Sequence, residues 1–307
     1  MVVEDRPDPE PGHGEVLVSV RAAGLNGADM LQRRGLYAPP PGTTDVPGLE
    51  LAGLVVGVGP GVTRFEPGDR VMAVVAGGGQ AELAVVHERA AMPVPVGIEW
   101  TAAGGFPEVF TTAHDALFTQ CQLLMGERVC IHGGAGGVGT AAIQLAAAAG
   151  AWVTATVRDP DQREAVAALG SAVGWTEVVP PEAFVDHGPF DVVLELVGAP
   201  NLAGDLASLD IGGRISIIGV GGGAIAELNL LALMGKRARI HGSTLRSRPL
   251  EQKADAARRV ERSVLPLLEA EDIVVPVAAT FPLDDIAAAY DRFAAGSKLG
   301  KIVVVFD

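Results

Sequence analysis

Short runs of β-branched and apolar residues, broken by glycine and proline, fill the chain from residue 15 to about residue 105. Such runs, bounded by turn residues, are typical of strands. Gly-Pro-Gly at 59–61 and Pro-Gly-Asp at 67–69 mark turns, because proline presets φ and glycine allows the chain to reverse. The pattern therefore predicts a β-rich domain. Its predicted strands are 16–20, 54–58, 70–75 and 83–86.

A different pattern begins at Arg128, where strands that are apolar on both faces alternate with helical segments. This alternation is typical of a doubly wound parallel sheet. Its predicted strands are 129–132, 152–157, 191–197, 214–220 and 238–244, and its predicted helices follow the first strand to residue 149 and cover 161–169, 201–209 and 227–234. A helix over 101–124 is expected to connect the two patterns.

The last part of the chain is expected to return to the β-rich domain. After Pro249 the pattern predicts a helix to about residue 270, a strand at 274–278, a helix at 284–294 and a strand at 301–306. The predicted fold class is therefore α/β with two domains. The β-domain is discontinuous, formed by 1–110 and 250–307, and the parallel-sheet domain is formed by 111–249.

The composition narrows the possible functions. The chain has 307 residues, of which 49% are hydrophobic, and a formal net charge of −14. This charge repels phosphate backbones and anionic membranes, so a nucleic-acid or membrane-surface partner is not expected. Only two cysteines are present, without zinc-site spacing, and the acidic start resembles no targeting signal; a cytoplasmic location is expected.

Residues 129–157 contain no Asp, Glu, Lys or Arg and are long enough to be read as a membrane span. Six glycines, His132, Gln144 and three threonines lie within this stretch. These polar and turn-forming residues favour a succession of strand, glycine loop, helix and strand instead.

The glycine loop after the strand at 129–132 has the spacing G-x-G-x-x-G. In this motif the first glycine permits a tight turn, the second lets the backbone approach a pyrophosphate, and the third lets the helix pack closely. The alternative is a packing turn, but the setting between a strand and a helix favours dinucleotide binding. The candidate phosphate-binding residues are Gly134, Gly136, Gly137, Val138 and Gly139.

The residue that follows the second strand of the predicted parallel sheet, 152–157, selects between the two nicotinamide cofactors NADH and NADPH. An acidic residue there would bind the ribose 2′-hydroxyl group of NADH, but this chain has Arg158. A guanidinium pairs with a 2′-phosphate, so Arg158 favours NADPH. A solvated arginine is the alternative, and the neighbouring Asp159 argues for it.

Several segments resemble the zinc-free medium-chain dehydrogenases/reductases, within them the quinone oxidoreductases related to zeta-crystallin, and most of all the branch of tumour-suppressor-inducible quinone oxidoreductases. The matching segments are 22–26, 26–33, 37–42, 47–53, 66–71, 132–139, 244–248 and 299–303. The resemblance implies a GroES-like β-domain, a Rossmann domain, an active-site cleft between them, and a homodimer. Relatives are expected to begin one strand and turn before the position of Met1.

The resemblance also bears on zinc. In the alcohol-dehydrogenase branch a cysteine and a histidine occupy the positions of Asn26 and Leu49, and neither replacement is a usual zinc ligand. No metal is therefore expected, and hydride transfer has to proceed with hydrogen-bond donors stabilising the charge on the acceptor.

Three residues on one loop are the candidate catalytic residues. The resemblance places Asn26, Asp29 and Tyr37 near the nicotinamide, with Tyr37 donating to the acceptor oxygen, Asn26 positioning cofactor or acceptor, and Asp29 orienting its neighbours. The alternatives are an aromatic ring packed on Pro39 and Pro40 for Tyr37 and a helix cap for Asp29.

Further cofactor contacts rest on the resemblance alone. They are Thr112, Gly219, Val220, Leu245 and Arg246, expected on the nicotinamide side. The function expected is NADPH-dependent, zinc-independent reduction of a quinone. The alternatives are a reductase of activated C=C bonds, with an enone substrate, and an NADPH-binding protein without turnover.

Overall fold

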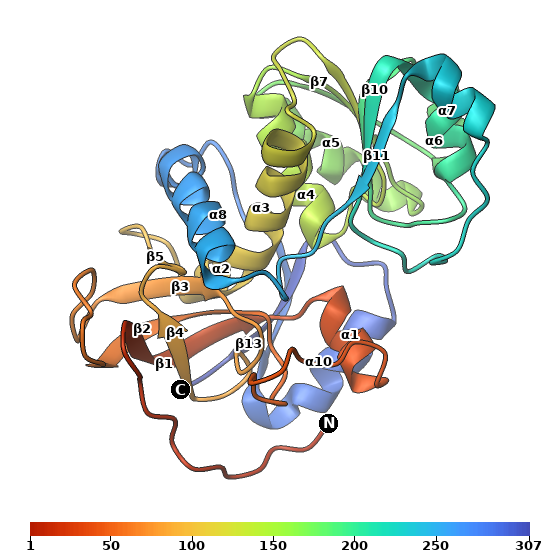
Figure 1. Cartoon of the computed structure of the whole chain (residues 1–307). Coiled ribbons are helices and arrows are strands. Elements are labelled where there is room, and N and C mark those ends of the chain that lie inside the picture. Colours follow the sequence, from red (N-terminus) through yellow and green to blue (C-terminus); the bar gives the residue numbers. More distant parts are fainter. The chain divides into compact units, whose positions relative to one another are not determined.

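The structure is a computed structural model that describes all 307 residues, and the chain forms two compact units (Figure 1). Unit 1 is Met1–Thr111 with Leu245–Asp307, and unit 2 is Thr112–Thr244. The chain returns to unit 1 at Leu245, five residues before the expected position, 250. Arg246 explains this early return, because its buried guanidinium donates to the Ala76 carbonyl at 2.7 Å and to Gln32 Oε1 at 2.6 Å.

Unit 1 is built on a mixed sheet of seven strands. The strand order is β12-β13-β1-β2-β3-β5, with β4 also pairing with β1, and only β12 and β13 run parallel. The strands are β1 (Glu15–Gly24), β2 (Glu50–Val58), β3 (Arg70–Val74), β4 (Leu83–His87), β5 (Ala91–Pro93), β12 (Val277–Pro282) and β13 (Lys301–Val305). Alternate residues of β1 are buried, as expected for a strand with one face on the core. Figure 1 shows the C-terminal strand β13 beside β1, which confirms the predicted return.

The helices of this part of the chain differ from the prediction in two places. The helices are α1 (Gly27–Arg33), α2 (Trp100–Gly105), α3 (Pro107–His114), α8 (Leu250–Ser263), α9 (Leu265–Glu269) and α10 (Ile286–Ala294). The single helix predicted over 101–124 is wrong, because it is broken before Pro107 and ends with a π-helical turn, η1 (Asp115–Gln120). The helix after Pro249 is likewise interrupted at Val264, two residues before Pro266. Proline lacks the N–H group and crowds the preceding turn, which explains both breaks.

Unit 2 is a six-stranded parallel sheet in the order β11-β10-β9-β6-β7-β8. The strands are β6 (Arg128–Ile131), β7 (Trp152–Thr156), β8 (Trp175–Val179), β9 (Phe190–Glu195), β10 (Leu209–Ile217) and β11 (Arg239–Gly242), and the helices are α4 (Gly137–Ala148), α5 (Arg163–Ser171), α6 (Leu202–Ser208) and α7 (Leu230–Lys236). This is the strand order of a Rossmann domain. The predicted α/β class with a GroES-like and a Rossmann domain is confirmed.

The strand order reverses between β6 and β9, which are neighbours in the sheet. In open parallel sheets, ligands bind outside the carboxyl ends of the strands at such a switch point. The glycine loop follows β6, and Glu195 ends β9. No helix combines the length and apolar character needed to cross a membrane, and residues 129–157 form β6, the loop, α4 and β7, as the sequence predicted.

Candidate cofactor and acceptor sites

The glycines of the loop after β6 have three different environments. Gly133 has φ +67°, and a Cβ atom on Gly139 would lie 2.3 Å from the Gly133 carbonyl oxygen. A Cβ atom on Gly134 would lie 3.1 Å from the Cβ of Ala155 in the neighbouring strand. At Gly136 the nearest atom would be 3.4 Å away, an ordinary contact. The loop is therefore tightly packed on its protein side and open at its second motif glycine.

The open glycine lies at the start of α4. Gly136 is the N-cap residue, and the next residues, Gly137, Val138 and Gly139, form the first turn. Amide groups of a first helical turn have no intrahelical acceptor, and the helix dipole adds partial positive charge. The first turn of α4 thus fits an anionic group, and the absence of a Cβ atom at Gly136 leaves the backbone accessible to a pyrophosphate.

Arg158 follows β7 and is exposed. Its guanidinium group makes no hydrogen bond or ion pair with the protein. The carboxylate of Asp159 is turned toward the next helical segment, where it accepts from the Asp161 amide at 3.1 Å. Asp159 therefore does not neutralise Arg158, which leaves the arginine free to pair with an anion.

Of the remaining predicted cofactor residues of unit 2, Gly219 and Val220 lie in a loop and Thr112 lies in a helix. Gly219 follows β10 and donates its amide to the Glu195 carbonyl at 3.1 Å; a Cβ atom there would lie 2.3 Å from the Leu196 carbonyl oxygen. Val220 is exposed beside it, and Thr112 is buried in α3. The two loops after β9 and β10 are thus held in direct contact.

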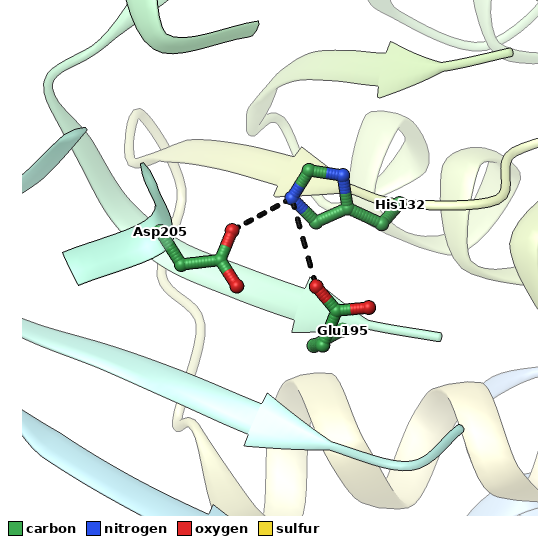
Figure 2. Close-up of side chains that lie close together, drawn as sticks. All are labelled: His132, Glu195 and Asp205. Carbon is green, nitrogen blue, oxygen red and sulfur yellow. Dashed lines mark hydrogen bonds and ion pairs between the residues drawn. The ribbon is translucent and has the colours of Figure 1, made fainter. Parts of the chain in front are cut away.

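His132, which directly precedes the glycine loop, forms a buried cluster with Asp205 and Glu195 (Figure 2). These three residues are called the triad below. His132 Nε2 lies 2.8 Å from Asp205 Oδ1 and 3.9 Å from Glu195 Oε2. All three side chains are at most 1% exposed. The sequence analysis did not find this cluster, because His132 and Asp205 are 73 positions apart.

The charges of the triad depend on one another. Burial favours a neutral imidazole, but Cys130 and Asp205 outweigh it and raise the pKa of His132 to about 11. Burial and the nearby Asp205 raise the pKa of Glu195. The ligand atoms lie within 4.8 Å of one another, a spacing that a metal ion could use. The imidazole already donates to Asp205, and Glu195 accepts from backbone amides, so the triad is a hydrogen-bonded network tied to the backbone.

Both cysteines are buried and free. Burial raises the pKa of Cys121 to about 12 and raises that of Cys130. Neither thiol is activated, so both behave as small buried apolar residues.

In unit 1, Asn26 and Asp29 form the start of α1. Asn26 is the N-cap residue, and Asp29 accepts its amide at 2.8 Å, which closes a capping box. Asp29 also accepts the Gly48 amide at 3.2 Å and is completely buried. Burial raises the pKa of Asp29 to about 6, although the Asn26 hydrogen bond opposes the shift. Asp29 therefore holds the Asn26 and Gly48 backbone in place as part of a helix cap.

The Asn26 side chain is fully engaged. Its Nδ2 donates to Glu50 Oε1 at 2.9 Å, and its Oδ1 accepts from Lys301 Nζ at 2.7 Å. Lys301 also pairs with Glu50 at 2.7 Å, and all three residues are buried. The amide at this position is thus committed to a neutralised ion pair. Sequence reasoning named Asn26 but missed its partner Lys301, which lies 275 positions away.

Tyr37 lies against Arg246. The guanidinium carbon is 5.0 Å from the Tyr37 ring centroid, and the group donates to the Tyr37 carbonyl at 3.1 Å. The hydroxyl group has no hydrogen-bond partner in the protein. Burial raises the pKa of Tyr37, although Arg246 opposes the shift, so the phenol is protonated at neutral pH and can donate. Leu245 is buried beside Arg246.

Two sequence families match the chain, the alcohol dehydrogenase GroES-like domain at residues 12–120 and the zinc-binding dehydrogenases at residues 137–262. The quinone oxidoreductase of Lama guanicoe is 30% identical over 304 residues, which cover 97% of this chain and 90% of that protein. The quinone oxidoreductase of Rattus norvegicus is 29% identical over 97% of this chain and 91% of its own length. The chain belongs to the zinc-free, quinone oxidoreductase-like medium-chain dehydrogenases/reductases.

Solved structures of this superfamily have the same fold. A quinone oxidoreductase of Pseudomonas syringae has a TM-score of 0.83 at 27% identity, covering 99% of this chain and 94% of its own. A mycobacterial protein complexed with NADPH has a TM-score of 0.85 at 26% identity, covering 99% and 95%. This member of the superfamily is therefore an oxidoreductase with a fold that binds pyridine nucleotides.

Zinc appears in the name of the second matching family, but this medium-chain reductase lacks zinc ligands at the two positions, 26 and 49, where the alcohol-dehydrogenase branch has them. Leu49 is a buried core residue, and the Asn26 amide is occupied by Glu50 and Lys301. A leucine offers no ligand atom, and the carboxylate of Glu50 already has a cationic partner.

Proposed function

We propose that the protein is an NADPH-dependent reductase of quinones. The proposal rests on one combination of features: Gly136 leaves the loop backbone accessible, and the Arg158 guanidinium has no partner in the protein. The chain that carries both residues aligns over 97% of its length with a quinone oxidoreductase. The glycine loop would hold the pyrophosphate, and Arg158 would pair with the 2′-phosphate that distinguishes NADPH from NADH.

The chain's own residues then have defined tasks. Bound NADPH supplies a hydride, and the acceptor oxygen gains negative charge as it is reduced. The protonated Tyr37 hydroxyl donates a hydrogen bond to that oxygen. Arg246 packs on the Tyr37 ring, and the Asn26–Asp29 capping box fixes the start of α1, the helix that precedes Tyr37. Thr112, Gly219, Val220 and Leu245 are proposed to border the nicotinamide.

The test is NADPH oxidation by the purified protein with one ortho-quinone, one para-quinone and one enal. We expect turnover with at least one quinone, and we expect Tyr37→Phe to lower kcat about tenfold, less than for an oxyanion donor in acyl transfer because quinones are strongly electrophilic. Turnover with the enal alone would exclude quinone reduction. Binding without turnover on any acceptor would identify a non-catalytic NADPH-binding protein.

Reduction of an activated C=C bond is the second candidate. Segments of two polyketide synthases, from Streptomyces halstedii and Streptomyces orinoci, are 38% and 40% identical over 67% of this chain, although they make up only 4% and 9% of those proteins. Both proteins are named for polyketide synthesis and not for quinone reduction, so a non-quinone acceptor is the second candidate. The enal in the same panel separates this candidate from the first.

A further inference from the structure

The triad lies at the switch point of the Rossmann sheet. His132 directly follows β6, Glu195 ends the adjacent β9, and Asp205 comes from α6 (Figure 2). The dashed lines of Figure 2 run from one imidazole nitrogen to both carboxyl groups. The triad is therefore placed directly under the loops that border the proposed nucleotide site.

Two members of the triad, His132 and Glu195, reach different loops. The other imidazole nitrogen of His132 lies 3.1 Å from Thr156 Oγ1, which accepts from the Gly133 amide at 3.3 Å. Glu195 Oε1 accepts from the amides of Val197 and Gly198, the latter at 2.7 Å. The network thus joins the glycine loop, the end of β7 and the loop after β9.

The triad also contains buried carboxylate oxygens without partners. Glu195 Oε2 and Asp205 Oδ2 are buried and make no hydrogen bond. Burying a carboxyl oxygen without a partner is costly, and the nearby imidazole is the group that offsets this cost for both acids. The orientation of His132 is therefore constrained from two sides, and so is the loop that follows it.

We propose that the His132–Asp205–Glu195 triad positions the dinucleotide-binding loop, so that affinity for NADPH depends on residues that do not touch the nucleotide. The proposal rests on the proposed function, since it assumes NADPH at this loop. His132, Asp205 and Glu195 are positioning residues and act through Gly133, Thr156 and Gly198.

The test compares the wild-type protein with Asp205→Asn and Thr156→Val. Asp205→Asn keeps the shape but removes the charge that orients the imidazole, and Thr156→Val removes the hydroxyl group between His132 and Gly133. We expect each change to raise the Kd and the KM for NADPH about tenfold. We expect kcat at saturating NADPH and the KM for the quinone to stay within about twofold, because the hydride-transfer geometry is restored once nucleotide is bound.

A second readout is the proton NMR signal of the His132 imidazole. We expect the proton between His132 and Asp205 to give a strongly deshielded signal that shifts when NADPH is added and disappears in Asp205→Asn. A role limited to stability would lower Tm but would leave this signal unmoved by nucleotide.

The matched control is His187→Gln. His187 pairs with Glu177 at 2.9 Å in the same unit, so this variant also removes a histidine–carboxylate pair, but one that no loop of the nucleotide site contacts. Its Kd is expected to stay within about twofold of the wild-type value. A folded Thr156→Val variant with unchanged Kd would overturn the role of the triad while wild-type binding stands. Failure of the wild-type protein itself to bind NADPH would overturn the proposed function, and the role of the triad with it.

Discussion

Glu108 begins α3 with a carboxyl group that has no hydrogen-bond or ion-pair partner, although its amide donates to Glu50 Oε2 at 2.8 Å. Burial, with the charge of Glu50, raises the pKa of Glu108 to about 8, while Lys301 and Lys253 oppose the shift. The folded protein therefore retains a proton that the unfolded chain loses near pH 4.5. The contribution of Glu108 to the free energy of unfolding therefore falls as the pH rises from 4.5, the pKa of Glu108 in the unfolded chain, to about 8, its pKa in the folded protein.

Replacing Glu108 by glutamine should remove this dependence. At about pH 5 the two proteins should have similar free energies of unfolding, and at about pH 9 Glu108→Gln should be more stable by about 1–3 kcal/mol. Urea unfolding at the two pH values measures the difference. Asp29 and every other group titrate in both proteins, so the comparison isolates Glu108; a wild-type protein that is as stable as the variant at the higher pH would contradict the assignment.

At the scale of single residues, the sequence indicated which residues belong to the site better than it indicated which residues they contact. Asn26 and Asp29 were expected on one loop, but Asn26 caps α1 and Asp29 lies within it. Lys301 and Asp205 could not be found, since their partners lie far away in sequence and meet only when the sheets form. Arg246 was expected beside the cofactor, but its buried donors go to Ala76, Tyr37 and Gln32, a contact set that no local pattern encodes.

Elements were predictable where a strand is buried on both faces. β6, β7 and β9 were found within one or two residues, because their apolar runs are continuous. β8 was missed since it is an edge strand whose residues are mostly half-exposed. β12 begins at Val277, three residues later than predicted, because Pro276 cannot donate to a sheet. The short α1 was missed because its seven residues are too few for a periodic pattern.

The glycine loop allows a paired prediction. Gly136→Ala should leave Tm unchanged, because Gly136 has φ −74° and its Cβ would meet only an ordinary contact, yet it should weaken NADPH binding about tenfold or more by obstructing the pyrophosphate. Gly139→Ala should lower Tm as well, since its Cβ would lie 2.3 Å from the Gly133 carbonyl oxygen. Thermal unfolding and NADPH titration of both variants separate these effects. Equal NADPH affinity in Gly136→Ala and wild type would contradict the pyrophosphate site.

At the scale of the whole molecule, unit 2 leaves an apolar surface next to an open sheet edge. β11 is an edge strand, and α7 buries none of its residues completely. Leu230, Leu231 and Met234 of α7 and the nearby Ile225 are 64% to 92% exposed. Exposed apolar residues beside an unpaired edge are typical of a subunit interface. The homodimer expected from the family resemblance would place a second copy of this chain on this surface.

We therefore expect a homodimer in solution. Light scattering coupled to size exclusion should give twice the mass of 31.5 kDa, and a double variant Leu231→Asp, Met234→Asp should give the monomer mass with NADPH binding retained. Val58→Asp, at an exposed apolar position of unit 1, is the control and should remain dimeric. A monomeric wild-type protein would exclude the dimer.

The central claim is that this chain uses NADPH to reduce a quinone, with Arg158 selecting the cofactor. The most direct test is kcat/KM for NADPH and for NADH with the best quinone, in the wild-type protein and in Arg158→Asp. The account predicts a preference for NADPH of about tenfold or more in the wild-type protein, and its loss or reversal in the variant. A wild-type preference for NADH, or a preference for NADPH that survives Arg158→Asp, would contradict it.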